Sequence, residues 1–289
     1  MAHSVIILRT HYISSETFQM ASALAHKGAE VVIAIDETHA TISSPIPKIS
    51  VTPRAAVDLG LSPSPDFAWR CGDYCLYMAR QQYPDASEYW LVEHDVRINW
   101  QAAASFFLPF RDSTAHFHAA RLQASDQNWY WHRSLGDREG VMRCLFPIVR
   151  ATGEAIDYLL PLRRLSTPSH HIGLPNDEAF VATTLSDGGF YCADIAGVHP
   201  GSYDWSTFSF SRPIPVRSFD RNKPDARLYH PVLSGPAFLK KAMQYCSKPR
   251  RPAELEEIAA SVELECGPEV AANFRHKVHC QTPYTTSRR

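Results

Sequence analysis

Two short, continuous apolar segments near the start of the chain constrain its fold most. Val5–Arg9 (VIILR) and Glu30–Asp36 (EVVIAID) have the length of strands, and their apolar residues are not interrupted by regular polar positions. Between them, Ser14 and Ser15 can cap a helix that ends at Gly28. Strands that are buried on both faces and joined through a helix pair in parallel. The pattern therefore predicts an α/β protein.

The rest of the chain continues this alternation. Lys48–Val51 has the pattern of a short strand, Gly72–Gln82 has helical spacing, and Tyr89–Val92 is an apolar, aromatic strand. We expect a helix over Val141–Leu165 and another that begins after Asn176, which can act as its N-cap.

Length and composition fit one large catalytic domain. The chain has 289 residues, of which 45% are hydrophobic, so it can bury a sizeable core. We expect a mixed, mainly parallel sheet flanked by helices over residues 1–250. A C-terminal helix and a polar tail are expected over residues 251–289.

Charge and cysteine content limit the classes of partner and the cellular locations that fit the chain. The chain carries 29 Lys and Arg against 30 Asp and Glu, and this balance argues against nucleic acid as a partner. No apolar run reaches the length of a transmembrane helix, and the first residues do not resemble a signal peptide. Seven scattered cysteines do not suggest a disulfide framework. We therefore expect a cytoplasmic protein, with peripheral membrane contact through Lys248–Arg251 left open.

The segment most informative about function follows the strand at Tyr89–Val92. Glu93 and Asp95 stand at its end, and carboxylates at positions i and i+2 of an extended chain point to the same side. Ligands of open α/β sheets bind at the carboxyl ends of the strands. Mg²⁺ and Mn²⁺ prefer oxygen ligands and often bridge to diphosphate oxygens. The E-x-D pattern thus favours a metal–diphosphate site, although a solvated turn or a helix cap has the same composition.

The loop after the first strand excludes two common nucleotide-binding motifs. Its sequence, RTHYISSE, has no glycine, so neither a dinucleotide-binding fingerprint nor a P-loop is present.

The E-x-D segment resembles the metal motif of GT-A glycosyltransferases. YWLVEHDV is similar to the Y-Y-W-x-x-E-x-D-V strand of fungal α-mannosyltransferases and related glycosyltransferase-like proteins. The resemblance extends upstream to Trp69 and Gly72–Tyr74, and downstream to Tyr229–Val232. It covers roughly residues 3 to 240 and is sharp around 69–97. The chain lacks the glutamate-centred downstream motif of the fungal enzymes, so a mannose donor and a retaining mechanism are not implied.

This resemblance implies a GT-A-like fold and roles for particular residues. Mn²⁺ or Mg²⁺ would be held by Glu93, Asp95 and a late histidine, His230, for which His199 is a rival. The nucleotide-sugar donor would be contacted from the ends of the first strands, the motif helix and the motif strand, by Arg9, Thr10, His11, Asp36, Asp73 and Glu93. For Arg9, Thr10 and His11 a plain connecting loop remains an alternative, for Asp36 a solvated turn, and for Asp73 a helix cap.

Two acidic residues are candidates for the catalytic base. Asp177 and Glu178 follow the expected N-cap Asn176. A carboxylate that faces an acceptor hydroxyl can take its proton, although acidic residues in a first helical turn are also a common capping pattern. The sequence does not choose between the two residues.

The sequence thus predicts a metal-dependent glycosyltransferase. It would move a sugar from a nucleotide-diphosphate sugar to a hydroxyl of a glycan, a lipid-linked acceptor or a small molecule. Trp129, Tyr130 and Trp131 could stack on a sugar, or be buried in the core. A sugar-phosphate nucleotidyltransferase and a non-catalytic sugar-nucleotide-binding module are the alternatives.

Overall fold

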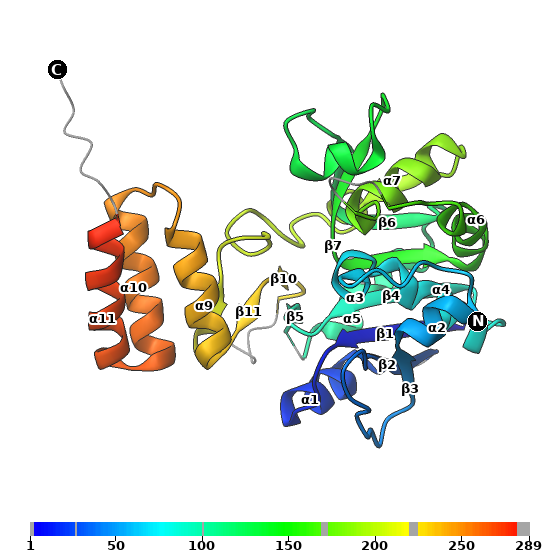
Figure 1. The fold of residues 1–289 in the computed structure, drawn as a ribbon. Helices are drawn as coiled ribbons and strands as arrows, with labels where there is room; N and C mark the ends of the chain where they lie inside the picture. Colours follow the sequence, from blue (N-terminus) through cyan, green and yellow to red (C-terminus); the bar gives the residue numbers. More distant parts are fainter. Residues whose placement is uncertain (1–2, 27, 100, 169–172, 220–224, 282–289) are drawn as a thin grey trace. The chain divides into compact units, whose positions relative to one another are not determined.

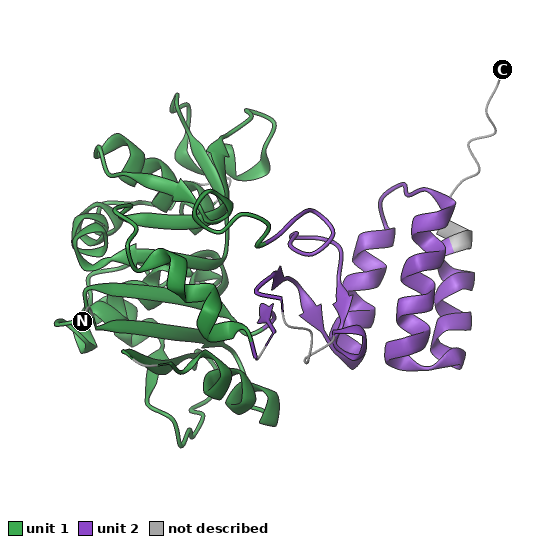
Figure 2. Ribbon diagram, turned by 180° about the vertical axis from the view of Figure 1, so that it is seen from behind, with its two compact units in different colours: residues 1–94, 102–202 green, residues 95–101, 203–289 purple. Residues whose placement is uncertain are grey.

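The computed structural model describes residues 3–26, 28–99, 101–168, 173–219 and 225–281. The chain forms two compact units (Figure 2). The first contains residues 1–94 and 102–202, and the second contains residues 95–101 and 203–289. The division expected at residue 250 lies inside the second unit. The helices on either side of this point share one apolar core, so they belong together.

The first unit is built on a seven-stranded sheet in the order β3-β2-β1-β4-β7-β6-β8 (Figure 1). All neighbouring strands pair in parallel except β7, which is antiparallel to β4 and β6. The α/β class and the mixed, mainly parallel sheet are therefore confirmed. The strands are β1 (Ser4–Thr10), β2 (Ala29–Asp36), β3 (Lys48–Val51), β4 (Glu88–Glu93), β6 (Phe117–Ala124), β7 (Met142–Thr152) and β8 (Cys192–Asp194).

Helices cover both faces of this sheet. Val5, Ile7 and Leu91 belong to an apolar core that includes residues of α4, α6 and α7. Trp90 points to the other face, where its ring packs edge-on against Phe107 of α5. The helical segments are α1 (Ser15–Leu24), α2 (Pro53–Asp58), α3 (Phe67–Arg70), α4 (Asp73–Gln82), α5 (Ala103–Phe107), η1 (Leu108–Phe110), η2 (Tyr130–Leu135), α6 (Gly153–Arg164), α7 (Asp177–Asp187) and α8 (Ile195–Val198).

The helix expected over Val141–Leu165 is wrong in its first half. That half is β7, an apolar central strand rich in residues that suit a sheet, and only the second half forms the helix α6. Pro147 is unusual in a central strand, because it has no N–H for the ladder. It lies where the ladder between β6 and β7 shifts register, so its missing N–H falls at an irregularity of the ladder.

The predicted N-cap of α7 is confirmed. The Asn176 side chain accepts a hydrogen bond of 3.1 Å from the Glu178 N–H. This cap fixes where α7 begins and therefore where Asp177 and Glu178 lie.

In its described part, the second unit combines short strand pairs with three helices. β5 (Arg97–Ile98) pairs antiparallel with β10 (Leu228–Tyr229), and β9 (Ile214–Pro215) pairs parallel with β11 (Val232–Leu233). The 3-10 turn η3 (Val216–Ser218) follows β9, and the helices are α9 (Gly235–Cys246), α10 (Pro252–Cys266) and α11 (Pro268–Gln281). Within the described residues after position 250, the structure therefore has two helices instead of the single one expected. The predicted polar tail lies, beyond Gln281, outside the described residues.

Among the described residues, no helix combines the length and the apolar character that crossing a membrane requires.

Candidate functional site

The order of strands points to a ligand site at one place on the sheet. From β1 the chain proceeds outward through β2 to β3 and then returns to β4 on the other side of β1. The strand order therefore reverses between β1 and β4. In open α/β sheets, ligands bind outside the carboxyl ends of the strands at this switch point. Arg9 and Glu93 are register partners there.

Strand alternation brings Arg9 and Glu93 together. Arg9 follows Val5 and Ile7 on the face of the sheet that α4 covers, and Glu93 follows Leu91 on the same face. The Arg9 Nη1 donates to Glu93 Oε1 at 2.5 Å, and their side chains are 12% and 25% exposed. This is a partly accessible ion pair at the edge of the sheet.

The same arginine ties α3 to the sheet edge. Arg9 Nη2 donates to the carbonyl oxygens of Ala68 at 2.5 Å and Trp69 at 2.9 Å. Burial opposes the charge of Arg9, but the Glu93 carboxylate raises the pKa of the guanidinium above its ordinary value. A contact between Arg9 and a nucleotide stays a prediction.

The loop after β1 presents rings beside this pair. Thr10 is buried, and its hydroxyl donates to the Tyr12 carbonyl at 2.7 Å, which shapes the turn. The rings of His11, Tyr12 and His94 meet edge-on, with centroids 4.9 to 5.1 Å apart. His11 is exposed, so a ligand at the switch point can reach it.

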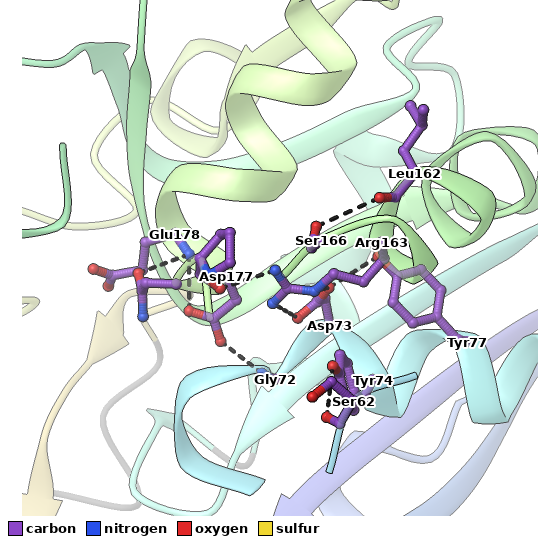
Figure 3. Close-up of polar contacts among 12 residues, drawn as sticks. Ser62, Gly72, Asp73, Tyr74, Tyr77, Leu162, Arg163, Ser166, Asp177 and Glu178 are labelled. Atoms are coloured by element: carbon purple, nitrogen blue, oxygen red, sulfur yellow. Dashed lines mark hydrogen bonds and ion pairs between the residues drawn. The ribbon is translucent and has the colours of Figure 1, made fainter. Parts of the chain in front are cut away.

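Asp177 lies beside the same arginine. Its Oδ2 accepts a 2.7 Å hydrogen bond from the Gly72 N–H. A Cβ atom at position 72 would lie 2.5 Å from Arg9 Nη1 and 2.7 Å from Asp177 Oδ2. Only glycine fits between these two groups without displacing them. Figure 3 shows the Asp177 side chain directed toward Gly72.

Burial changes the acidity of both candidate bases. Desolvation raises the pKa of Asp177 to about 7, although the Arg9 charge opposes the rise. Burial likewise raises the pKa of Glu178 well above its ordinary value, with a further contribution from Asp177. A carboxyl group with a pKa near neutrality is suited to accept a proton at physiological pH.

Asp73 occupies a different environment. It is inaccessible to solvent, and its carboxylate oxygens pair with Arg163 Nη2 at 3.0 Å and Nε at 2.9 Å. The Tyr77 hydroxyl adds a bond of 2.9 Å (Figure 3). This position fits a structural link between α4 and α6, and it does not support the contact with the donor that was expected of Asp73.

Asp36 ends β2, the strand beside β1. Its Oδ1 accepts hydrogen bonds from the Thr38 N–H at 2.9 Å and the Thr38 hydroxyl at 2.6 Å. This turn agrees with the structural alternative for Asp36 and leaves its donor contact a prediction.

The E-x-D segment was expected to be extended throughout, but the strand ends at its first residue. β4 stops at Glu93, and His94 and Asp95 form a turn. The His94 N–H donates to the Arg9 carbonyl at 2.9 Å, which closes the ladder with β1. Alternation along an extended strand therefore does not place the Asp95 side chain, contrary to the expectation.

In the second unit, Asp95 and His230 lie close together. His230 Nε2 is 3.6 Å from Asp95 Oδ2, and the imidazole is buried. The His230 Nδ1 lies 2.7 Å from the Ser209 carbonyl oxygen, which can only accept, so Nδ1 carries the proton. Its Nε2 is then the nitrogen with a lone pair in the neutral ring. The rival His199 belongs to the first unit, where its ring stacks on Phe106.

Sequence reasoning missed three contributors to the switch-point site. Gly72 is one: it was predicted as the first residue of the helix over Gly72–Gln82, and in the structure it directly precedes α4. Tyr12 and His94 are the others, and each is adjacent in sequence to a residue that had been singled out.

Comparison with known proteins gives only distant likenesses. No family model matches the chain, and no curated protein matches it. Similar solved structures include a glycosyltransferase involved in the glycosylation of the major capsid of PBCV-1 (11% identity, TM-score 0.38, 84% of this chain and 98% of that chain). Another is mouse xyloside xylosyltransferase 1 (10% identity, TM-score 0.36, 67% of this chain and 84% of that chain). A third is the inositol-1-phosphate CTP transferase from T. maritima (8% identity, TM-score 0.35, 68% of this chain and 86% of that chain). Likenesses at this level leave the function to be argued from the site residues.

Proposed function

We propose that the chain is a metal-dependent glycosyltransferase that moves a sugar from a nucleotide-diphosphate sugar to an acceptor hydroxyl. The observation that carries the proposal is the position of Glu93, the first carboxylate of the E-x-D segment. It ends β4 at the switch point of the sheet, opposite Arg9 and beside the exposed rings of the β1 loop. We place the reaction in the cytoplasm, as the sequence predicts.

The three candidate metal ligands suit a divalent cation. We propose that Asp95 and His230, which are paired in the second unit, hold Mn²⁺ or Mg²⁺ together with Glu93, two residues earlier in the chain. Two carboxylates and a neutral imidazole are ligands that Mn²⁺ accepts, and Mg²⁺ accepts the carboxylates. The bond between the His230 ring and the Ser209 carbonyl is the kind of outer contact that orients a metal-binding histidine. When bound, the metal would offset negative charge on the leaving diphosphate.

The residues of the first unit supply the remaining chemistry. Arg9 holds Glu93 in place and adds positive charge at the site of the diphosphate. The acceptor oxygen forms a bond to the anomeric carbon, the bond from that carbon to the diphosphate oxygen breaks, and its electron pair leaves with the nucleoside diphosphate. Asp177 takes the hydroxyl proton, which is the chemistry of inverting transfer. Glu178, the next residue of α7, is the alternative base.

A transfer assay tests this function. The purified chain is incubated with UDP-, GDP-, CMP- and dTDP-sugars and a mixture of oligosaccharides, and the phosphorus species are followed by NMR. The proposal expects release of the nucleoside product with one donor family, loss of release on chelation, and recovery with Mn²⁺. The variant Asp95→Asn should bind metal weakly and transfer no sugar.

Other outcomes would identify the alternatives. Release of pyrophosphate from a nucleoside triphosphate and a sugar phosphate would show a nucleotidyltransferase. Binding of a nucleotide sugar without turnover would show a non-catalytic module. Full turnover by Asp95→Asn would contradict the metal assignment.

A further inference from the structure

Three aromatic side chains from two distant segments gather on the surface of the first unit. Trp69 belongs to α3, and Tyr130 and Trp131 belong to η2; we call these three residues the aromatic platform. The rings of Trp69 and Trp131 lie 5.8 Å apart at 57°, and those of Tyr130 and Trp131 lie 4.5 Å apart at 72°. Trp69 is 64% exposed and Tyr130 is 66% exposed.

Hydrogen bonds attach the platform to both parts of the switch-point site. The Trp69 carbonyl accepts from Arg9 Nη2. On the other side, the Ser134 hydroxyl donates to the Trp131 carbonyl at 2.7 Å and accepts from the Asn176 N–H at 3.3 Å. Asn176 caps α7 directly before Asp177. The platform is therefore held by the arginine that pairs with Glu93 and by the cap next to the candidate base.

Packing within the fold does not account for the exposed rings. Trp131 is partly covered by Arg70, whose guanidinium lies 5.0 Å from the ring centroid and pairs with Asp66 at 2.6 Å. Trp69 and Tyr130 keep most of their surface in water, where large aromatic groups are unfavourable. Clustered exposed aromatic groups beside a polar site are typical of surfaces that bind a ligand.

We propose that the aromatic platform binds the acceptor and that this acceptor is a glycan. A pyranose ring can place its apolar C–H face on an indole or phenol ring while its hydroxyl groups face polar neighbours. This inference rests on the proposed function and deepens it by naming the acceptor class. The attachment to the Asn176 cap would place an acceptor hydroxyl near Asp177.

The geometry favours a sugar over the other ligands that aromatic rings bind. Neither measured ring pair is parallel, so the platform has no slot that would sandwich a flat nucleobase. The ion pair of Arg70 and Asp66 borders Trp131, and charged neighbours suit a ligand that carries hydroxyl groups better than an alkyl chain.

Direct binding of oligosaccharides tests the proposal without requiring catalysis. Mannotriose, maltotriose, xylotriose and galactobiose are titrated against the full chain and followed by ligand-observed NMR and tryptophan fluorescence. We expect at least one to bind, and Trp69→Ala and Tyr130→Ala each to weaken it about tenfold. Tyr191→Ala is the matched control, because this 57% exposed tyrosine directly precedes β8, at the amino ends of the parallel strands, whereas the switch-point site lies at their carboxyl ends. It should bind like the wild type.

The design separates this inference from the proposed function. If the two platform variants keep nucleotide-sugar binding while they lose oligosaccharide binding, the platform is an acceptor site. If they lose UDP or GDP binding instead, the rings contact the donor base and the inference is overturned. Binding only to vesicles that contain a polyprenyl phosphate, or no weakening relative to Tyr191→Ala, would overturn it as well. A failed transfer assay with intact oligosaccharide binding would count against the function alone.

Discussion

Three carboxylate–guanidinium pairs of the first unit have the same chemistry and very different surroundings. The pair of Asp73 and Arg163 has side chains that are 0% exposed. The pair of Glu93 and Arg9 lies at the edge of the sheet, at 25% and 12% exposure. The pair of Asp58 and Arg54 on α2 is largely in solvent, at 55% and 83%.

The difference separates a structural role from a functional one. The buried pair is inaccessible to solvent and bonds further to the Tyr77 hydroxyl and the Pro175 carbonyl, so it can hold α4 and α6 but is not reached from solvent. The edge pair is held in position by the hydrogen bonds of Arg9, and both of its side chains are partly exposed to a ligand. The surface pair is open, and less than half of either side chain is covered by the protein. Only the edge pair has both properties that a ligand site needs.

The largest effect is expected at the buried pair. Asp73→Ala leaves the Arg163 charge buried without its carboxylate, which should lower the free energy of unfolding by about 3–5 kcal/mol. Urea denaturation measures this change. The double variant Asp73→Leu with Arg163→Met should recover much of the loss, and a loss below about 1 kcal/mol in Asp73→Ala would show that the pair is not structural.

The edge pair should give the opposite result. Glu93→Gln keeps the shape of the side chain and removes its charge, so stability should change by only about 1 kcal/mol. Transfer should fall by about a hundredfold or more, because the metal that would offset charge on the leaving diphosphate loses a carboxylate ligand. The comparison fails if Glu93→Gln transfers sugar normally or if it unfolds as readily as Asp73→Ala.

The close approach at Gly72 can be broken with a single methyl group. Gly72→Ala places a Cβ against Arg9 and Asp177, so one of these side chains must move. We expect a loss of about 1–3 kcal/mol in stability and a marked loss of transfer. Gly197→Ala is the control, since a Cβ there would have no atom within 4 Å apart from its chain neighbours and the backbone of its own helix. Equal behaviour of the two variants would contradict the packing described here.

The raised pKa of Asp177 predicts a pH dependence of stability. Between its ordinary pKa of 3.8 and its folded value of about 7, the folded state binds one proton more than the unfolded state. The free energy of unfolding should therefore fall by about 1.4 kcal/mol per pH unit as pH rises through this window. Asp177→Asn should remove this contribution and leave only that of Glu178, whose pKa burial also raises, whereas the exposed Asp58→Asn should keep the full slope. An unchanged slope in Asp177→Asn would locate the titrating group elsewhere.

The smallest change in stability is expected at the surface pair of Asp58 and Arg54. Asp58→Ala should change stability by no more than about 0.5 kcal/mol, because exposed pairs four residues apart on a helix contribute little. Thermal unfolding at low and high salt measures it. A loss comparable to that of Asp73→Ala would show that burial does not separate these pairs.

Much of the sheet edge follows from sequence alone. The apolar runs of β1, β2 and β4 predict parallel strands, and a residue that follows such a run must lie at a strand end. The position of Glu93, and the cap that places Asp177, were therefore predictable. Each depends on neighbours within a few residues.

The remaining features depend on contacts between distant residues. The bond from Asp73 to Arg163 joins positions 90 residues apart, and no local pattern reveals it. β7 was taken for a helix although its residues suit a sheet, and its central position becomes visible only once its partners β4 and β6 are paired with it. The turn at His94 and Asp95 follows from the ladder bond to Arg9, which becomes visible only once β1 and β4 are paired.

One measurement tests the central claim most directly. The wild-type chain and Glu93→Gln are screened by thermal shift against UDP-, GDP-, CMP- and dTDP-sugars, each with and without Mn²⁺, and Asp58→Asn serves as the control. Binding to the folded state raises the melting temperature. The account predicts a shift for one nucleotide family that requires Mn²⁺, disappears in Glu93→Gln and persists in Asp58→Asn. A shift that is equal in Glu93→Gln, or no shift with any donor, would contradict a nucleotide-sugar site at the ends of β1 and β4.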